Sequence, residues 1–274
     1  MRCCLAAPDR QRRCASPSFR TARTHRRLCL EPLEQRQMLT TITQLTDDSG
    51  AFTFSSVQDV SDDASRVVML SNQNIDNGNP DGVVQVFLHN RATDTTEQLT
   101  GHSIGSVSSP TVDLGGSISS DGLQVVFSSP GDSLPGSNPD GGLELYLYSV
   151  DTTQIVQLTE ADAGDSSQPV ISGDGQWVAF ASTADLTGTN SDGNREIFRV
   201  HTSTLVVEQI TDSPNGASQL PAIDADGSRV AFQSTADLTG DNSYGSTENF
   251  FYYDDTENVL QITSSTVGTR NYPS

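Results

Sequence analysis

Three polar segments with the same residue spacing contain the side chains best suited to bind a metal ion. Each has the pattern Asn-x-Asp-Gly and, three residues after the glycine, an acid or an amide. Oxygen ligands at alternate positions before a glycine turn, with a carboxylate after it, suit calcium, which takes about six to eight oxygens. The candidate calcium ligands are Asn79, Asp81, Asn138, Asp140, Glu144, Asn190, Asp192 and Glu196.

The same pattern also has a structural interpretation, in which the asparagine or aspartate side chain orders a turn before a strand. A hand-type calcium loop needs an acid where Gly136 and Gly188 stand, and its closing glutamate comes later than Glu144 and Glu196 do. A fourth copy of the pattern has Tyr244 in place of the central carboxylate. Calcium binding and turn formation both stay open for these loops, and we predict no other cofactor.

Patterns that indicate catalysis are weaker. Residues 101–105, Gly-His-Ser-Ile-Gly, have the spacing of a nucleophile elbow, but that motif needs a strand, a strained turn and a helix, whereas polar, β-prone residues follow here. Trp177, the sole tryptophan, could stack on a sugar, and packing against a neighbouring sheet is the alternative. No pair among the 35 acids stands out for glycoside cleavage. We therefore assign no catalytic residue and expect a protein that is not an enzyme.

The polar segments belong to an internal repeat of about 52 residues, which two signatures reveal. Gln-Leu-Thr or Gln-Ile-Thr recurs five times, with spacings of 54, 59, 52 and 52 residues. A string of the type Ile-Ser-x-Asp-Gly recurs in the same phase, and an apolar run follows each copy. The first signature begins at Gln44, Gln98, Gln157, Gln209 and Gln261, and the second at Val60, Ile118, Ile171 and Ile223.

The third copy of the repeat predicts four antiparallel strands. We expect Pro169 at the start of the first strand, where no backbone donor is needed, and a tight hairpin turn at residues 173–175. The second strand is apolar on both faces, as in a sheet packed between two others. The predicted strands are residues 169–172, 176–182, 196–201 and 205–211. The predicted fold class is all-β.

Two strings of the third copy resemble the blade of TolB-like, WD-type β-propellers. They are Pro-Val-Ile-Ser-Gly-Asp-Gly-Gln-Trp-Val-Ala-Phe (169–180) and Glu-Ile-Phe through Gln-Ile-Thr (196–211). The resemblance covers residues 41–274 and departs in the first blade, where Asp63-Ala64 replaces Asp-Gly. It implies a β-propeller of four-stranded blades. We expect four complete blades, at about residues 51–100, 101–159, 160–211 and 212–263.

Two partial repeats accompany these blades: a lone outer strand at residues 40–46 and the start of a fifth repeat at residues 264–274. Four blades and two fragments do not close a ring. We therefore predict an incomplete ring, in a chain that is a truncated or interrupted copy of a longer protein. The alternative is self-association through the open blade edges, because exposed strand edges and sheet faces seek partners.

Charge divides the chain into a basic leader, residues 1–39, and an acidic body, residues 40–274. Residues 1–40 contain nine arginines against three acids and hold all four cysteines, whereas the rest has no lysine and a net charge of −26. An acidic surface repels the phosphates of nucleic acids and anionic lipids and favours a cation or a basic partner. We expect no nucleic-acid binding, and no segment is long and apolar enough to span a membrane.

The end of the leader, residues 26–39, contains Leu-Glu-Pro-Leu-Glu-Gln-Arg followed by Met-Leu. It resembles the LEPR leader of large surface and secreted proteins of some marine bacteria, which implies export; a disordered tail is the alternative. We expect an extracytoplasmic location, either periplasmic or at the cell surface. The predicted function is a binding or scaffold module for a protein or a cell-envelope polymer. The alternatives are a propeller enzyme acting on polysaccharide and a purely structural segment of a larger surface protein.

Overall fold

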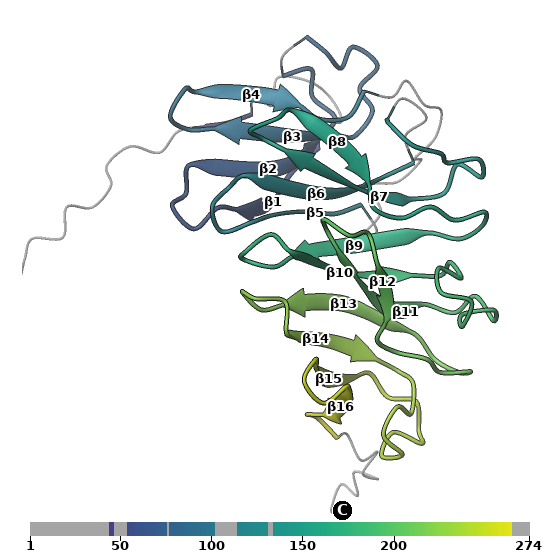
Figure 1. The fold of residues 1–274 in the computed structure, drawn as a ribbon. Coiled ribbons are helices and arrows are strands. Elements are labelled where there is room, and N and C mark those ends of the chain that lie inside the picture. Colours follow the sequence, from purple (N-terminus) through teal and green to yellow (C-terminus); the bar gives the residue numbers. More distant parts are fainter. Residues whose placement is uncertain (1–43, 47–53, 76, 102–113, 131–133, 265–274) are drawn as a thin grey trace, which may run out of the picture. The chain divides into compact units, whose positions relative to one another are not determined.

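The computed structural model describes residues 44–46, 54–75, 77–101, 114–130 and 134–264. In these residues the chain is all-β, with sixteen strands in four antiparallel four-stranded sheets and no helix (Figure 1). This is the predicted array of four propeller blades. The leader, residues 1–39, lies outside the described residues. Of the lone outer strand expected at residues 40–46, only residues 44–46 are described, and they form no strand.

Each sheet is built from consecutive strands, so strand order in space follows strand order in the chain. The first sheet contains β1 (Ser55–Val60), β2 (Arg66–Ser71), β3 (Gln85–Asn90) and β4 (Thr95–Gln98). The second contains β5 (Gly116–Ile118), β6 (Gln124–Ser129), β7 (Glu144–Ser149) and β8 (Gln154–Gln157). The third contains β9 (Ser166–Ile171), β10 (Trp177–Ser182), β11 (Glu196–His201) and β12 (Val207–Gln209). The fourth contains β13 (Ser218–Ile223), β14 (Arg229–Ser234), β15 (Glu248–Tyr253) and β16 (Asn258–Gln261).

In the second and third sheets, the two central strands carry apolar side chains on both faces because another sheet packs on either side of them. In the third sheet, β10 and β11 pair without interruption from Trp177 opposite His201 to Ser182 opposite Glu196. Val178 and Phe180 pack toward the second sheet, whereas Ala179 and Ala181 pack toward the fourth. The apolar run that the sequence predicted therefore belongs to a sheet covered on both faces.

The first strand of the third sheet differs from the prediction. Pro169 does not start this strand, because β9 begins at Ser166 and has an irregularity in its pairing opposite Ala179 and Ala181. Gln168, just before the proline, has a φ of 55°, in the left-handed region. A bulged residue on an edge strand donates no hydrogen bond to the neighbouring strand, so a proline, which has no N–H, is tolerated there. The predicted reason for the proline therefore holds, although Pro169 lies within the strand and not at its start.

The hairpin turn between the first and second strands is held by its own serine and aspartate. Ser172 Oγ donates to Asp174 Oδ1 (2.6 Å) and accepts the backbone N–H of Trp177 (3.0 Å), and Asp174 Oδ1 accepts the N–H of Gln176 (3.0 Å). The last residue of the turn, Gly175, has a φ of 73°. The equivalent residue of the first sheet, Ala64, adopts the same conformation at 53° without being glycine.

Consecutive sheets are joined by backbone hydrogen bonds between these turns as well as by apolar packing. Asp62 N donates to Ser120 O (3.1 Å), Ser120 N to Gly173 O (3.0 Å), and Asp174 N to Ala225 O (2.9 Å). Apolar clusters lie between the first and second, the second and third, and the third and fourth sheets. Fully buried phenylalanines occur in each cluster, and they include Phe127, Phe180, Phe198 and Phe250.

Candidate functional site

The candidate asparagine and aspartate ligands lie at one edge of the array, in the loops that join the second strand of a sheet to the third, and Glu144 and Glu196 are the first residues of β7 and β11. We call this edge the loop edge; it comprises the described residues of 72–84, 130–143, 183–195 and 235–247. The turns between the third and fourth strands lie at the opposite end of the third strand. Among the described residues, the candidate asparagine and aspartate ligands all lie in these long polar loops.

The asparagine of each loop fastens the loop to its own backbone. In the third sheet, Asn190 is 2% exposed and its Nδ2 donates to Ala184 O (3.3 Å) and Asn194 O (3.1 Å). In the fourth sheet, Asn242 makes the same bond to the carbonyl four residues later, Ser246 O, at 2.8 Å. Asn79 and Asn138 do so in the first and second sheets, also at 2.8 Å. These asparagines therefore order the loops.

The central aspartates point into solvent. Asp81, Asp140 and Asp192 are all exposed, and the glycine that follows each has a positive φ of 65° to 69°. Tyr244 takes this place in the fourth loop and is 78% exposed. Each loop thus presents one large or charged side chain from the same kind of ordered turn.

The glutamates that close the pattern are buried and bind a threonine that lies two residues after the end of the outer strand. Thr159 Oγ1 donates to Glu144 Oε2, and Ala161 N donates to Glu144 Oε1 (3.0 Å). The same threonine oxygen accepts the backbone N–H of Leu145 (2.9 Å). Since Thr159 is the threonine of Gln-Leu-Thr, we call this contact the Thr–Glu joint, and it explains why that signature recurs.

A joint at the equivalent position recurs in each sheet. Thr211 binds Glu196 in the third sheet, and Thr263 Oγ1 donates to Glu248 Oε2 (2.5 Å) in the fourth. In the first sheet an amide replaces the acid, and Thr100 Oγ1 donates to Gln85 Oε1 (2.5 Å). Sequence reasoning missed this pairing, although the Gln-Leu-Thr signature and the Asn-x-Asp-Gly pattern share a period that places each threonine fifteen residues after its partner.

The glutamine of the signature fastens the outer strand to the loop. Gln157 Nε2 donates to Thr159 O and to Ser137 O (both 2.7 Å), and its Oε1 accepts the N–H of Ser137 (2.7 Å). Gln209 accepts from Thr187 in the third sheet (2.9 Å) in the same way. The isolated copy at Gln44 also donates to its own Thr46 O, at 2.6 Å.

The predicted calcium ligands are therefore divided among three surroundings: an asparagine bound to backbone, an exposed aspartate and a buried glutamate bound to threonine. Asp140 and Asp192 lie close enough to Glu144 and Glu196 to influence their ionisation. Among the described residues, no group of three or more His, Cys, Asp or Glu side chains is arranged to hold a metal ion. Calcium binding stays a prediction.

Trp177 packs between the third and fourth sheets. The guanidinium carbon of Arg199 lies 4.2 Å from its ring centroid, and the His201 ring meets it edge-on at 4.8 Å. A Cβ added to Gly227, in the fourth sheet, would lie 2.3 Å from Trp177 Cδ1. The partly buried indole thus packs against protein groups, as the packing interpretation predicted.

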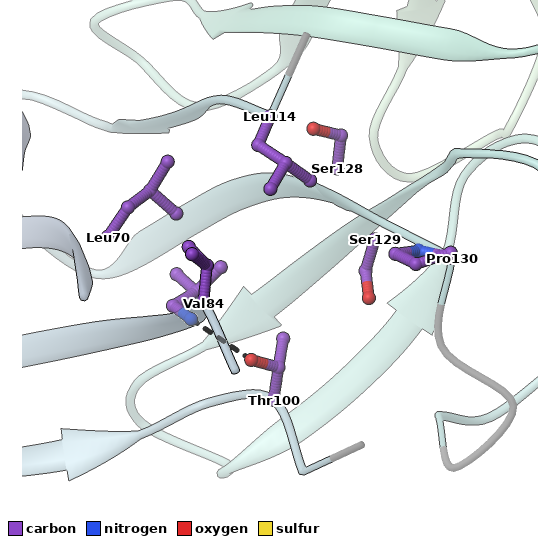
Figure 2. Close-up of a pocket in the computed structure, with 8 residues that line it drawn as sticks. Leu70, Val84, Thr100, Leu114, Ser128, Ser129 and Pro130 are labelled. Carbon is purple, nitrogen blue, oxygen red and sulfur yellow. Dashed lines mark hydrogen bonds between the residues drawn. The ribbon is translucent and has the colours of Figure 1, made fainter. Parts of the chain in front are cut away.

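A small pocket lies between the first two sheets (Figure 2). Its wall contains five apolar side chains and three hydroxyl groups. Thr100 Oγ1 accepts the N–H of Val86 (3.0 Å), the bond drawn in Figure 2, and Ser128 Oγ accepts that of Gly115 (3.0 Å). The lining residues are Leu70, Val84, Val86, Thr100, Leu114, Ser128, Ser129 and Pro130. Residues 102–105 of the nucleophile-elbow pattern lie outside the described residues.

No protein-family model matches the chain, and no curated protein matches it. The structure is similar to a protein assigned as TolB from Agrobacterium tumefaciens, with 19% identity, a TM-score of 0.49 and coverage of 74% of this chain and 62% of that one. It is also similar to oligogalacturonate lyase from Vibrio parahaemolyticus, with 17% identity, a TM-score of 0.49 and coverage of 76% and 52%.

A third similar structure is the β-propeller domain of Cps50 (Swd1) from Myceliophteria thermophila, with 13% identity, a TM-score of 0.44 and coverage of 77% of this chain and 56% of that one. The chain thus spans between about half and two thirds of the length of these three proteins. These are likenesses of fold.

Proposed function

We propose that this propeller scaffold is a non-catalytic, extracytoplasmic binding module that presents carboxylates on its loop edge to a basic protein or cell-envelope polymer. The observation that carries the proposal is the repetition of one exposed aspartate, at Asp81, Asp140 and Asp192, on loops held in the same conformation. Ordered loops lose little conformational entropy when a partner binds, which favours affinity.

The charge of the body supports a basic partner. Residues 41–274 have a net charge of −26, and the described residues of the loop edge contain a single basic side chain, Arg195. A field of one sign steers oppositely charged partners and repels nucleic acid. The resemblance of residues 26–39 to an export leader supports an extracytoplasmic location. Among the described residues, no helix is long and apolar enough to cross a membrane.

The test compares two triple variants of the full chain that remove the same charge from opposite ends of the third strands. One carries Asp81→Asn, Asp140→Asn and Asp192→Asn; the control carries Asp94→Asn, Asp151→Asn and Asp255→Asn, which are exposed in the turns between the third and fourth strands. Binding of poly-arginine, followed by calorimetry at low salt, should weaken several-fold more in the loop variant than in the control.

Equal weakening in both variants would reduce the interaction to net charge and overturn the loop edge as the binding site. The enzyme alternative is tested separately, by incubating the wild-type chain with acidic and neutral polysaccharides and measuring new chain ends. Turnover that survives purification would overturn the non-catalytic proposal.

A further inference from the structure

The apolar residue of the Gln-Leu-Thr signature shows which sheet faces are covered by a neighbouring sheet. Leu99 and Leu158 are 6% and 5% exposed, in the clusters between the first and second and between the second and third sheets. Ile210 packs against the cluster between the third and fourth sheets. Ile262, the equivalent residue of the fourth sheet (β13–β16 in Figure 1), is 51% exposed. The corresponding face of the fourth sheet is therefore open at this position.

Strand pairing places one apolar row across all four strands of this open face. Phe251 pairs with Ala231 on one side and with Leu260 on the other, and Ala231 also pairs with Ala222. The sequence neighbours of this row on β14 and β15 pack toward the third sheet, so the row itself points the other way. Leu260 is 54% exposed, and the Phe251 ring stacks on Tyr253 with their centroids 6.0 Å apart. We call the following residues the fourth-sheet face: Ala222, Ala231, Phe251, Tyr253, Leu260 and Ile262.

The equivalent row of the third sheet shows how such a face is covered. Arg199 takes the place of Phe251 there and is 3% exposed beneath the fourth sheet, where it forms an ion pair with Asp254. A phenylalanine at this position needs apolar contacts instead of an acid. The fourth-sheet face therefore suits a cover that is apolar and brings no carboxylate to Phe251.

Charge distinguishes this face from the rest of the body. Among the described residues, no acidic side chain lies on this face of β13–β16, and the one charged side chain is Arg229, whose Nη1 lies 3.6 Å from Asp224 in the neighbouring turn. The polar side chains around the apolar row are Gln219, Arg229, Gln233, Asn249 and Asn258. Interface cores are likewise depleted in charge and enriched in aromatic residues, with a polar rim. A basic partner finds no carboxylate here, whereas another acidic chain meets none that repels it.

Two arrangements can join a second copy of this chain to the fourth-sheet face. A copy can pack head-to-tail, through its first sheet, or about a two-fold axis, through its own fourth-sheet face. Head-to-tail packing requires the outward face of the first sheet, which carries Met69 and Phe87. These side chains are 2% and 0% exposed, so that face is already buried. The two-fold arrangement remains, and it suits the amides around the apolar row, because an amide both donates and accepts hydrogen bonds.

We propose that the fourth-sheet face joins two copies of this chain into a two-fold dimer, sheet against sheet. The chain already packs sheet against sheet three times among its own four sheets. The exposed aspartates of the loop edge, Asp81, Asp140 and Asp192, lie in the loops of the first three sheets, so a dimer presents two copies of them. Two linked sites bind a polymeric partner more tightly than one. That gain depends on the proposed function, whereas the dimer itself does not.

Sedimentation equilibrium of the full chain tests the dimer, in a reducing buffer so that the cysteines of residues 1–39 form no disulfides between copies. We expect the mass of the wild type to rise from one chain to two as its concentration increases. Leu260→Asp places a charge in the apolar row of each copy and should raise the dissociation constant about tenfold or more. Because Leu260 is more than half exposed, the variant should fold, and its thermal unfolding checks this.

Val206→Asp supplies the matched control. Val206 is also 54% exposed and lies just before β12, outside the fourth-sheet face, so the substitution adds the same charge elsewhere. It should leave the dissociation constant within about twofold of the wild type, because salt screens a distant surface charge. If Leu260→Asp fails to fold, Ile262→Asp takes its place. Equal effects of the face variant and the control would attribute the association to net charge and overturn the proposed face.

Salt separates the dimer from the proposed function. Because salt screens the repulsion between two acidic bodies, dimerisation should strengthen as salt increases, whereas binding of poly-arginine should weaken. Loss of poly-arginine binding with the dimer intact would overturn the proposed function alone. A wild type that stays a single chain at every concentration and salt would overturn the dimer, and a mass that keeps rising beyond two chains would overturn the two-fold arrangement.

Discussion

Two interfaces between sheets use different chemistry at the same position of the repeat. One lies between the first and second sheets, and the other lies between the third and fourth. In the first interface, Leu88 lies opposite Glu97 on the neighbouring strand and packs within a large apolar cluster. In the last, Arg199 lies opposite Glu208 and is 3% exposed. One position of the repeat therefore accepts either a leucine or a buried cation, provided that the cation is paired.

Arg199 is paired from both sides of its interface. It forms ion pairs with Glu208 (2.6 Å), in its own sheet, and with Asp254, in the fourth sheet, and its Nη1 donates to Gly227 O (3.3 Å). Burial lowers the pKa of the guanidinium, but the hydrogen bonds to Asp254 and Glu208 outweigh burial and raise the pKa overall, so the group stays charged. Tyr252, with its ring centroid 5.4 Å away, completes the enclosure. Ion pairs and hydrogen bonds of Arg199 thus stabilise the last interface at the position where apolar packing of Leu88 stabilises the first.

The largest expected effect tests whether both interfaces still depend on apolar packing. Phe232→Ala, in the last interface, and Phe127→Ala, in the first, each remove a side chain that is at most 2% exposed. We expect each to cost about 3–5 kcal/mol in urea unfolding, because a cavity remains. A cost below about 1 kcal/mol for Phe232→Ala alone would mean that the ion pairs, rather than apolar packing, hold the last interface.

Replacement of Arg199 tests the comparison directly. Arg199→Ala should cost about 2–3 kcal/mol, less than a fully buried pair would, since the side chains of Glu208 and Asp254 are nearly half exposed. Arg199→Leu should cost less, because Leu147 fills the equivalent position of the second sheet opposite Val156. Equal losses for alanine and leucine, measured by urea unfolding, would contradict the interchangeability of leucine and arginine.

The turn glycine beside Trp177 should come next. Gly227→Ala would place a Cβ 2.3 Å from Trp177 Cδ1 at a φ of +77°, and we expect a loss of about 2 kcal/mol or more. Gly193→Ala is the control: its φ is +67°, but the nearest atom is 4.0 Å away, so only the backbone cost of about 1 kcal/mol applies. Thermal unfolding of both variants separates crowding at the interface from backbone strain.

The smallest effect concerns the polar contact of the first interface. Tyr148 Oη donates to both carboxylate oxygens of Glu97, at 3.0 and 3.1 Å, and burial together with this acid raises the pKa of the tyrosine to about 12. Tyr148→Phe should cost about 1 kcal/mol or less, since Glu97 can bind water instead. A loss of stability larger than that of Arg199→Ala would mean that polar contacts contribute more to the first interface than to the last.

The sequence predicted the repeat, the four strands of each sheet and the apolar faces, because these depend on local spacing and on residue type. It also predicted that Trp177 packs against protein. It placed Pro169 at the start of a strand instead of within one, since the left-handed conformation of Gln168 leaves no mark in residue type. A bulge depends on pairing with the next strand, which local spacing does not reveal.

The contacts of the loop edge were less predictable. The sequence grouped the Asn, Asp and Glu of each loop as ligands for one ion, but the structure assigns them to different partners. Whether Glu144 points to the Asp140 loop or to Thr159 depends on how β7 and β8 pair. The sequence contains that information only as the period shared by the Asn-x-Asp-Gly pattern and the Gln-Leu-Thr signature. The burial and pairing of Arg199 could not be predicted from local spacing, because its acidic partner, Asp254, is 55 residues away.

The turn-to-turn hydrogen bonds have a consequence for how such a protein can evolve. They join backbone atoms only, and the turns that make them read Ser-Asp-Asp-Ala, Ser-Ser-Asp-Gly, Ser-Gly-Asp-Gly and Asp-Ala-Asp-Gly. Because every residue except proline has the same donor and acceptor, one repeat can drift in sequence without losing its attachment to the next. Duplicated copies are therefore free to acquire separate surfaces while the spacing between sheets is inherited unchanged.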